Sequence, residues 1–496
     1  MEKNYPEIRL GLVMSSRNNF SEQLSADSAA DLKQFTANEK MDVSVCPILV
    51  ERENNISDIL DFLRREKCNA LAVVLGNFGA ETPETILAER FDGPVMFAGV
   101  TEECDERMYD SRRDSYCGML NCSYNLGIRG QKAYIPRYPV GTCEGIVKAM
   151  KKFLPVARAV VGLKALKIIS FGPRPDDFVA CNAPINGLYR LGVAIQENSE
   201  LDLLLAFNRH EGDKRIPAVA EDMARELGSD KYKETLPAMA QYELTLLDWM
   251  EENKGDRKYV VFANKCWPAF QQAFRFLPCY VHGRLAGKGI PVACETDIYG
   301  ALSEFIGLCA GEKPVTLMDI NNAVPDDIYK KVQEDGYPYR QGELFMAFHC
   351  GNTNSCYLIR PELKYKLNRK DPYAPETGKE LNRGTLEGRM IPGPSSVFRL
   401  HGAPDGSLLS YVVSGEILPV EVNTYGNYGL IGVREMERFY RYVLLDKHFP
   451  HHAAITFEDC SEAVYDIFEY LDIPYIGYNQ PASIHYAKEN PFYKDV

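Results

Sequence analysis

Residues 289–319 read GIPVACETDIYGALSEFIGLCAGEKPVTLMD, and this stretch carries the pattern from which the fold is predicted. A short apolar run, 290–294, ends at Glu295, and a second apolar run, 315–318, ends at Asp319. Between the two runs, apolar residues recur at helical spacing and are followed by a glycine and a proline. The stretch is therefore interpreted as strand, helix, strand, with a carboxylate at the carboxyl end of each strand.

The two carboxylates, 24 residues apart, are the first candidate site residues. In a parallel sheet the carboxyl ends of the strands form one crevice, and neighbouring strands lie about 5 Å apart. If these two strands are neighbours, Glu295 and Asp319 lie side by side. Two carboxylates in one crevice repel each other unless a proton or a metal ion lies between them.

Length and composition limit the classes of protein that are possible. A chain of 496 residues is too long for one core, and 45% hydrophobic with 25% charged residues is typical of a soluble globular protein. The net charge of −13 and the lack of a Lys/Arg cluster argue against a nucleic-acid partner. Neither a signal peptide nor an apolar stretch long enough for a membrane span is found. Fourteen scattered cysteines without a C-x-x-C pair indicate reduced thiols and a cytoplasmic location.

The order of predicted elements gives the fold class. Strands and helices alternate over 7–100 and again from 166, which predicts parallel sheets covered by helices. From about residue 351 short strands and Asp-Gly turns indicate antiparallel β structure. The prediction is α/β, with two Rossmann-like parallel-sheet domains followed by a β-rich, barrel-like C-terminal domain.

The predicted domains are 1–165, 166–325 and 326–496. The second contains Glu295, the first candidate metal-binding carboxylate, and the third contains a histidine pair near its C-terminus. Residues 101–142 are interpreted as connections, and 218–252 as one long helical tract. A helix from Gly145 is expected to be interrupted at Pro155.

Four successive predicted strands end in polar groups, at Asn264–Lys265, Glu295, Asp319 and His349. Each of these residues alone has a structural explanation. Glu295 could cap a helix N-terminus or form an ion pair, and Asp319 could be a helix cap or a turn residue. Most histidines in proteins are hydrogen-bonded polar residues without a catalytic role. Four in succession, of types suited to chemistry, favour a site.

The pair His451–His452 supplies a further candidate. Adjacent residues on a strand point to opposite faces, so at most one of the two is expected to enter the site. One imidazole and two carboxylates, with positions left open, suit Mn²⁺ or a similar divalent ion.

Three cysteines and one tryptophan lie next to these candidates. Nearby carboxylates raise the pKa of a thiol, so Cys266, Cys294 and Cys350 are interpreted as core thiols and not as nucleophiles. Trp267 is either a core aromatic or a wall on which a sugar stacks. No G-x-G-x-x-G follows a strand, which argues against a dinucleotide site.

The motifs GIPVACETDIYGAL, Met318–Asp319, KCWP, FHCGN and HHAAITFEDC together resemble the L-fucose isomerase and L-arabinose isomerase superfamily of aldose–ketose isomerases. The resemblance implies that Glu295, Asp319 and His452 hold Mn²⁺. It also implies substrate contacts from His349, which is a metal ligand in the arabinose branch, and from Arg17, and Trp267 is a further candidate for substrate binding. Active sites in this family lie at subunit boundaries, which implies a homo-oligomer, a trimer or a hexamer.

The resemblance and the acid pair imply one reaction. Glu295 and Asp319 would move protons during aldose–ketose isomerisation of an open-chain sugar, through a cis-enediol and with a divalent metal. One alternative is an isomerase of a sulfonated or phosphorylated hexose, whose anion would bind a basic pocket. The candidate cations for that pocket are His210, Arg17, Lys265 and Arg129. Another alternative is a non-catalytic cytoplasmic sugar-binding protein, with neither turnover nor a metal requirement.

Overall fold

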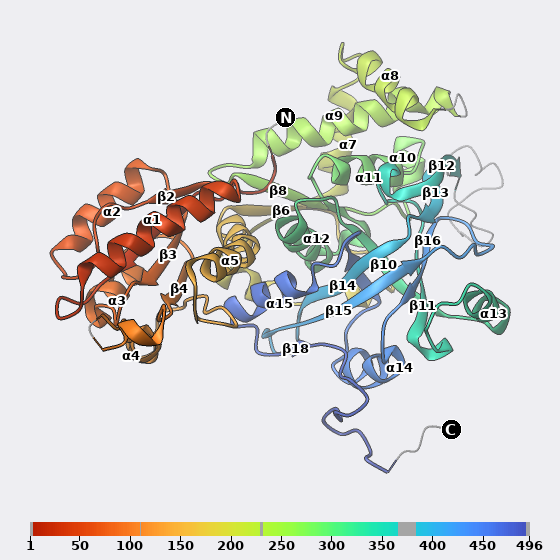
Figure 1. Cartoon of the computed structure of the whole chain (residues 1–496). Helices are drawn as coiled ribbons and strands as arrows, with labels where there is room; N and C mark the ends of the chain where they lie inside the picture. Colours follow the sequence, from red (N-terminus) through yellow and green to blue (C-terminus); the bar gives the residue numbers. More distant parts are fainter. Residues whose placement is uncertain (1–2, 110, 229–231, 366–382, 493–496) are drawn as a thin grey trace. The chain divides into compact units, whose positions relative to one another are not determined.

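The computed structural model describes residues 3–109, 111–228, 232–365 and 383–492 (Figure 1). The chain divides into two compact units. We call Pro6–Gly162 the N-terminal unit, and Met1–Tyr5 together with Leu163–Val496 the main unit.

The N-terminal unit is built on a five-stranded parallel sheet in the order β2-β1-β3-β4-β5. Its strands are β1 (Leu10–Ser15), β2 (Val43–Val45), β3 (Ala70–Leu75), β4 (Val95–Val100) and β5 (Val140–Gly141). Its helices are α1 (Glu22–Asn38), α2 (Asn55–Arg65), α3 (Glu81–Arg90), α4 (Ser115–Ile128) and α5 (Cys143–Lys164). Strands β1, β3 and β4 are buried at every position, as expected for a sheet covered on both faces. The α/β pattern predicted here is confirmed.

Two local predictions for this unit are wrong. The segment 101–142 is not only connection, because it contains helix α4. Helix α5 continues through Pro155. A proline inside a helix costs about 3 kcal/mol, and burial of Phe153 and Val156 on either side of it offsets that cost.

Glu84 lies on α3 and is fully buried in this unit. The Ser15 hydroxyl donates to its carboxylate, and the Ala80 N–H donates to Glu84 Oε2 over 3.1 Å. Burial raises the pKa of Glu84 from 4.5 to about 7, although these hydrogen bonds oppose the shift. The folded unit therefore holds a carboxyl group that stays protonated well above the pH at which it ionises in the unfolded chain.

We expect Glu84→Gln to stabilise the protein at alkaline but not at acidic pH. Because the folded pKa is raised, the stability contribution of Glu84 is fully present below pH 4.5 and is lost as the pH rises to about 7. That loss is on the order of 3 kcal/mol at 1.36 kcal/mol per pKa unit. Calorimetric Tm values at pH 5 and pH 8 should show a gain of several degrees at pH 8 only. The exposed Glu53→Gln is the matched control, and an equal Tm change at both pH values would contradict the expectation.

The main unit begins with a four-stranded parallel sheet, sheet B, in the order β7-β6-β8-β9. Its strands are β6 (Leu166–Phe171), β7 (Ala194–Asn198), β8 (Tyr259–Ala263) and β9 (Val292–Ala293). The α-helices of this region are α6 (Asn186–Arg190), α7 (Glu200–Arg209), α8 (Ile216–Leu227), α9 (Leu236–Asn253), α10 (Phe270–Phe274), α11 (Cys279–Gly287) and α12 (Ile298–Gly311). The single helix predicted over 218–252 is two, because Gly228 ends α8 at φ 60° and Pro237 lies in the first turn of α9.

A nine-stranded sheet, sheet C, follows in the order β12-β13-β16-β11-β10-β17-β14-β15-β18. Its strands are β10 (Thr316–Ala323), β11 (Leu344–His349), β12 (Leu358–Tyr365), β13 (Arg383–Met390), β14 (Gly393–Gly402), β15 (Leu408–Leu418), β16 (Asn427–Gly432), β17 (His452–Ile455) and β18 (Ile476–Gly477). Helices α13 (Asp326–Glu334), α14 (Met436–Phe439) and α15 (Ser461–Tyr470) connect them. Because β15 also pairs with β16, the strands from β16 through β11, β10, β17 and β14 to β15 close into a ring. The predicted fold class, including the barrel-like β-rich part, is confirmed.

The two strands of the 289–319 stretch are not neighbours, which corrects the sequence interpretation. Strand β9 is the edge of sheet B, whereas β10 lies in sheet C, antiparallel to β11 and β17. Helix α12 packs between the two sheets, against β8 and β9 on one side and β14 and β17 on the other (Figure 1). Residues 299–309 of α12 are all buried, so this helix is enclosed by protein instead of covering one face of a sheet.

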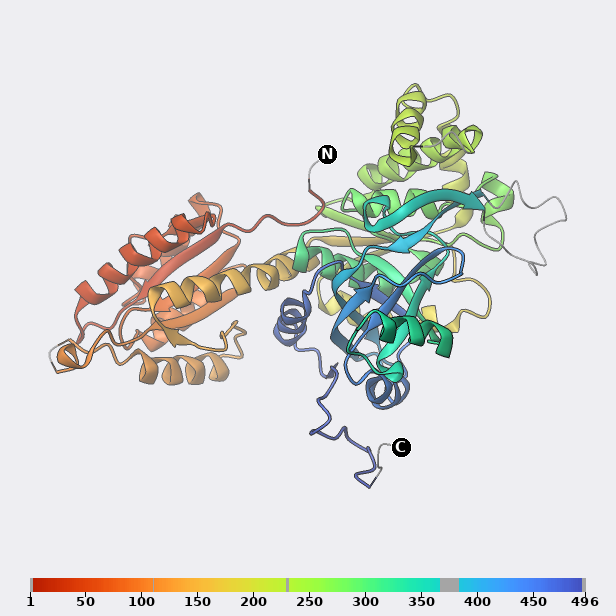
Figure 2. The same ribbon diagram turned by 45° about the vertical axis from the view of Figure 1, so that its right-hand side comes forward.

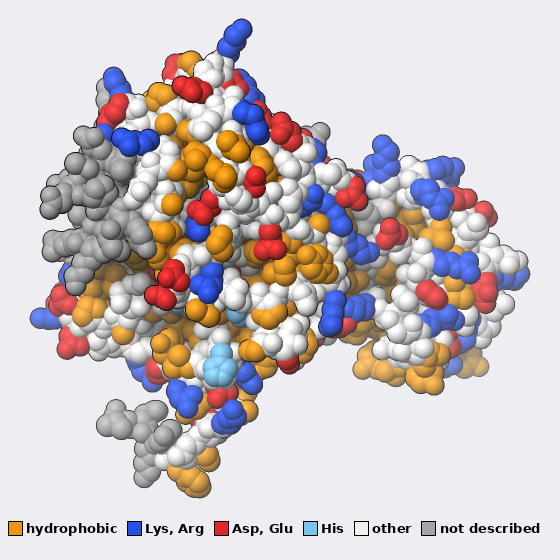
Figure 3. Space-filling view, turned by 180° about the vertical axis from the view of Figure 1, so that it is seen from behind, with side chains coloured by type: hydrophobic (Ala, Val, Ile, Leu, Met, Phe, Trp, Pro, Cys, Tyr) orange, Lys and Arg blue, Asp and Glu red, His pale blue; other side chains and the backbone are white. Residues whose placement is uncertain are grey.

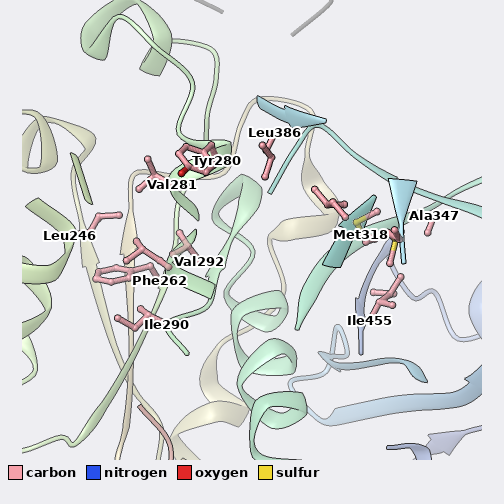
Figure 4. Close-up of a cluster of buried hydrophobic side chains, with 14 of the residues drawn as sticks. Leu246, Phe262, Tyr280, Val281, Ile290, Val292, Met318, Ala347, Leu386 and Ile455 are labelled. Atoms are coloured by element: carbon pink, nitrogen blue, oxygen red, sulfur yellow. The ribbon is translucent and has the colours of Figure 1, made fainter. Parts of the chain in front are cut away.

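One hydrophobic cluster joins both sheets of the main unit. It includes Phe262 and Val292 from sheet B, and Met318 and Ile455 from sheet C (Figure 4). The ends of β9 and β10 are therefore held at fixed positions by a shared core.

No described helix has the combination of length and hydropathy that a membrane crossing requires. All fourteen cysteines are free thiols, as expected from their scattered positions.

Candidate active site

Three residues predicted from the sequence as site candidates, Glu295, Asp319 and His452, lie close together in the main unit. His452 Nε2 lies 3.2 Å from Glu295 Oε2 and 3.6 Å from Asp319 Oδ1. His452 is 1% exposed, whereas Glu295 and Asp319 remain 13% and 19% exposed. The two carboxylates therefore face partly accessible space, and the imidazole lies behind them.

Backbone pairing explains the proximity of Asp319 and His452. They are direct partners in the antiparallel pair β10–β17, so their side chains leave the same face of the sheet. Glu295 reaches them from sheet B by another route. It follows β9 in a left-handed conformation, φ 62° and ψ 25°, and Thr296 continues at φ 58°. Non-glycine residues rarely adopt such values, and where they do the conformation often serves a functional site.

Asp297 fixes the orientation of His452. Its Oδ2 lies 2.8 Å from His452 Nδ1, and both its oxygens accept hydrogen bonds from the Arg399 guanidinium at 2.8 and 2.9 Å. It also accepts from Gly300 N over 2.8 Å, which caps α12. Burial alone would raise the pKa of Asp297, but Arg399 and His452 hold it well below the ordinary value. Asp297 is therefore an ionised acceptor of a hydrogen bond from His452 Nδ1–H.

The second ring nitrogen of His452 has no such partner. Nε2 is buried and makes no hydrogen bond of acceptable geometry with any described group, although two carboxylates lie near it. A histidine whose Nδ1–H is held by a carboxylate while Nε2 faces further ligands has the arrangement of a metal-binding imidazole. One nitrogen and two carboxylate oxygens, with room for water or substrate, fit a hard or borderline divalent ion such as Mn²⁺.

His451 corrects the expectation that only one of the two adjacent histidines enters the site. Its Nε2 lies 3.9 Å from Asp319 Oδ1, and its ring centroid is 4.4 Å from that of His452. The alternation of side chains does not apply because β17 begins only at His452. His451 is thus a second imidazole at the edge of the site.

Two of the three predicted substrate contacts lie near this centre. The ring centroid of His349 is 6.1 Å from that of His452, and His349 Nδ1 accepts from Cys350 N over 2.9 Å. Trp267 packs edge-on against Phe178, which in turn packs against His451.

Arg17, the third predicted contact, belongs to the N-terminal unit. There it pairs with Glu81 at 2.9 Å and lies over the ring of Phe78, 4.4 Å from its centroid. Its predicted role in substrate binding stays a prediction.

The cysteines beside the site are core thiols. A hydrogen bond with Cys266, together with burial, raises the pKa of Cys294 far above the ordinary range of a thiol. Both sulfurs belong to a small apolar cluster against which Trp267 and Cys350 pack. A thiol that stays protonated is a poor nucleophile, which agrees with the interpretation of Cys294 as a core thiol.

Three residues near His452 were not predicted from the sequence, namely Asp297, Arg399 and Cys181. The Sγ of Cys181 lies 3.9 Å from His452 Nδ1. Asp297 immediately precedes a predicted helix and would be taken for an ordinary N-cap. A fully buried arginine within an apolar strand is uncommon, and Arg399 in the segment SSVFRLHG was the available signal.

A cavity of about 930 Å³ lies beside the centre, in the main unit. Its lining includes Cys181 and Thr296, the residue after Glu295. Its lining also includes Arg174, Asn182 and Lys265. The cavity is large enough for a hexose and offers hydrogen-bond donors along its length.

Comparison with known proteins gives two matches to family models. The N-terminal domain model described as fucose/sulfoquinovose isomerase matches residues 11–164, and the L-fucose isomerase C-terminal domain model matches residues 347–479. Together they span more than half of the chain. Glu295 and Asp319 lie between the two matches, and His452 lies within the second.

Several curated relatives are sulfoquinovose isomerases. One from Alkalicoccus urumqiensis is 25% identical over 335 residues, which is 65% of this chain and 67% of the relative. One from Clostridium sp. (strain MSTE9) is 28% identical over 396 residues, or 75% and 78%. One from Priestia aryabhattai is 23% identical over 340 residues, or 66% and 68%. With both family models and these relatives in agreement, the chain belongs to the fucose/sulfoquinovose isomerase family and is an aldose–ketose isomerase.

Proposed function

We propose that this isomerase uses a divalent metal ion, Mn²⁺ or a close substitute, held by Glu295, Asp319 and His452. The observation that carries the proposal is the buried Nε2 of His452, which is aimed at two carboxylates while Asp297 holds the opposite nitrogen. Nε2 lies 3.2 Å from Glu295 Oε2 without a hydrogen bond of acceptable geometry, and a shared cation would satisfy the nitrogen and both carboxylates.

The reaction follows from the same groups. A divalent ion bound here would polarise the carbonyl of an open-chain sugar and acidify the neighbouring hydroxyl and carbon. Of Glu295 and Asp319, one carboxylate removes the proton from C2 and returns it to C1 through a cis-enediol. The other carboxylate moves the proton between O1 and O2. Asp297 keeps the His452 ring in place during these transfers.

A sulfonated hexose is the substrate class that we favour, because the relatives named above are sulfoquinovose isomerases. Lys265 and Arg174 line the cavity beside the centre. Lys265 Nζ lies 3.1 Å from Glu200 Oε2, and Arg174 donates to the Pro175 carbonyl over 3.0 Å. Within the described residues Arg174 has no carboxylate partner, so its guanidinium is the best placed cation for a sulfonate.

The other basic candidates have acidic partners inside their own units. Arg129 pairs with Glu89, and His210 pairs with Asp248. These ion pairs make both side chains weaker candidates for a substrate anion.

A neutral sugar of the L-fucose type is the second candidate. The C-terminal match is to an L-fucose isomerase model, and Asp176 and Glu197 also line the cavity, so its charge is not uniformly positive. Carboxylates and amides are typical partners of sugar hydroxyls. The resemblance further suggests a trimer or hexamer in the cytoplasm, with Arg17 contacting substrate at a subunit boundary.

The proposal is tested by stripping the full chain with a chelator, restoring Mn²⁺, and following ketose formation. The panel contains sulfoquinovose, L-fucose, D-arabinose and L-arabinose. We expect loss of turnover on chelation, recovery with Mn²⁺, and the highest kcat/KM for the sulfonated sugar. Turnover that is unaffected by complete metal removal would overturn the metal assignment, and turnover of the neutral sugars alone would overturn the favoured substrate.

The same panel run with Arg174→Gln separates the two substrate classes. If the sulfonate binds Arg174, KM for the sulfonated sugar rises by at least about tenfold, since a charge-assisted hydrogen bond contributes about 1.5–3 kcal/mol. Activity on neutral sugars is expected to change little. Arg225→Gln, an exposed arginine on α8 (67% exposed), is the control.

A further inference from the structure

Helix α4 of the N-terminal unit exposes an apolar face that the reaction does not explain. Tyr116, Leu120, Tyr124 and Ile128 follow one another at intervals of four residues and are 75%, 66%, 69% and 66% exposed. The whole helix, SYCGMLNCSYNLGI, contains no charged residue. Figure 3 shows hydrophobic side chains gathered at the lower edge of this unit. Exposed surface helices normally carry charges on their outer face, so this pattern marks an interaction surface.

The packing of the opposite face of α4 determines which side of the helix is exposed to solvent. A Cβ at Gly118 would lie 1.9 Å from the Phe78 carbonyl oxygen, so the helix backbone sits directly on the loop after β3. Met119, Cys122 and Leu126 are buried in the core of the unit. The helix therefore cannot rotate to bury its outer face, and Figure 2 shows it at the edge of the unit.

A membrane surface is a poor occupant for this face. Helices that lie on membranes carry lysine and arginine beside their apolar stripe, and α4 has neither. The segment before it, 101–114, has six acidic and three basic residues, which would repel anionic lipid.

We propose that the α4 face binds the α4 face of a second copy of this chain, antiparallel and related by a two-fold axis. The charges at the two ends of the helix support this occupant. Segment 101–114 is acidic overall, whereas 129–138, after the helix, has three basic residues and no acidic one, and of the three Arg129 already pairs with Glu89. Antiparallel pairing places the acidic end of one copy beside the basic end of the other, and parallel pairing places like charges together.

The surface is also self-complementary in size. Its large side chains alternate with the small residues Cys117, Ser123 and Gly127, and a Cβ at Gly127 would meet nothing within 4 Å. In a two-fold antiparallel pair centred between Leu120 and Tyr124, these two residues face each other, and Cys117 faces Gly127 of the second copy. Each copy of the helix therefore supplies both the large side chains and the small residues that they pack against, as an isologous interface requires. The interface is independent of the proposed metal and substrate.

The test compares the mass of the full chain with that of Leu120→Glu/Tyr124→Glu by sedimentation velocity at micromolar concentration. The wild type is expected to be an assembly of two or more 56.0 kDa chains, and the double variant is expected to have half that mass. Ala30→Glu/Gln34→Glu is the control, because it adds the same charges at the same spacing to exposed positions of α1. A monomeric wild type, or a double variant of unchanged mass, would overturn the proposal.

A second measurement does not need a destabilising substitution. Under mild oxidation, Gly127→Cys is expected to form a disulfide with Cys117 of the second copy and to run as a covalent dimer on a denaturing gel. Adding Cys117→Ser should abolish that dimer. If Gly127→Cys does not cross-link, or cross-links equally well without Cys117, the antiparallel arrangement is wrong.

Discussion

Glu295→Gln is expected to lower kcat by about 10²–10⁴-fold, the range typical of a lost general acid–base group. The amide matches the carboxylate in shape, so the turn at φ 62° and the contact with His452 are retained sterically. What is lost is the negative charge and the ability to carry a proton. Steady-state kinetics with saturating Mn²⁺ measure the effect, and the Tm should stay close to that of the wild type.

Glu304→Gln provides the matched control. Glu304 lies on α12 and is 2% exposed, and burial raises its pKa far above the usual value of a carboxyl. A protonated glutamic acid and a glutamine are both neutral, so this variant should keep kcat within about twofold. The assignment of Glu295 fails if its variant retains more than a tenth of wild-type activity.

Arg399→Met is expected to destabilise the main unit by about 3–5 kcal/mol, the cost of leaving one partner of a buried ion pair uncompensated. Arg399 is 0% exposed and Asp297 is 1% exposed, so water cannot replace the guanidinium. Methionine keeps similar length and fills the space with apolar atoms. Urea unfolding, followed by the fluorescence of Trp249 and Trp267 in the main unit, gives the free energy.

Two further variants test whether the loss of stability comes from the buried ion pair. Arg225→Met removes an arginine that is 67% exposed and pairs with Glu221, which is 74% exposed, and a surface ion pair contributes about 1 kcal/mol or less. Arg399→Lys keeps the charge but not the two parallel hydrogen bonds to Asp297, and should fall between the wild type and the methionine variant. A loss below 1 kcal/mol for Arg399→Met would show that the buried pair is not what stabilises this part of the fold.

The sequence predicted which side chains meet but not the route by which they meet. Glu295 and Asp319 were expected on adjacent parallel strands, and they lie in different sheets with α12 between them. Apolar runs of this kind identify strands without identifying the sheet they join, because sheet membership depends on long-range pairing. Residues 298–309 contain a single charged residue, Glu304, and this was the local sign that the helix would be enclosed.

The supporting residues were harder to predict than the site itself. Asp297 and His452, which are hydrogen-bonded, are 155 positions apart in the sequence, and Arg399 and Asp297 are 102 positions apart. No periodicity or spacing rule connects such positions, and an aspartate before a helix has an ordinary local explanation. Helix α4 was missed for a related reason, since glycine, serine and asparagine weaken a helical pattern that tertiary contacts restore.

The pairing of Asp319 with His452 divides the site into a rigid part and an adjustable part. Their spacing is set by the hydrogen-bond ladder between β10 and β17, and a slip of one residue would turn either side chain to the other face. Glu295 depends instead on the conformation of a turn after a strand of only two residues. Evolutionary adaptation to sugars of different shape is therefore expected to act through substitutions around the 294–297 turn, while the paired strands tolerate little variation in length.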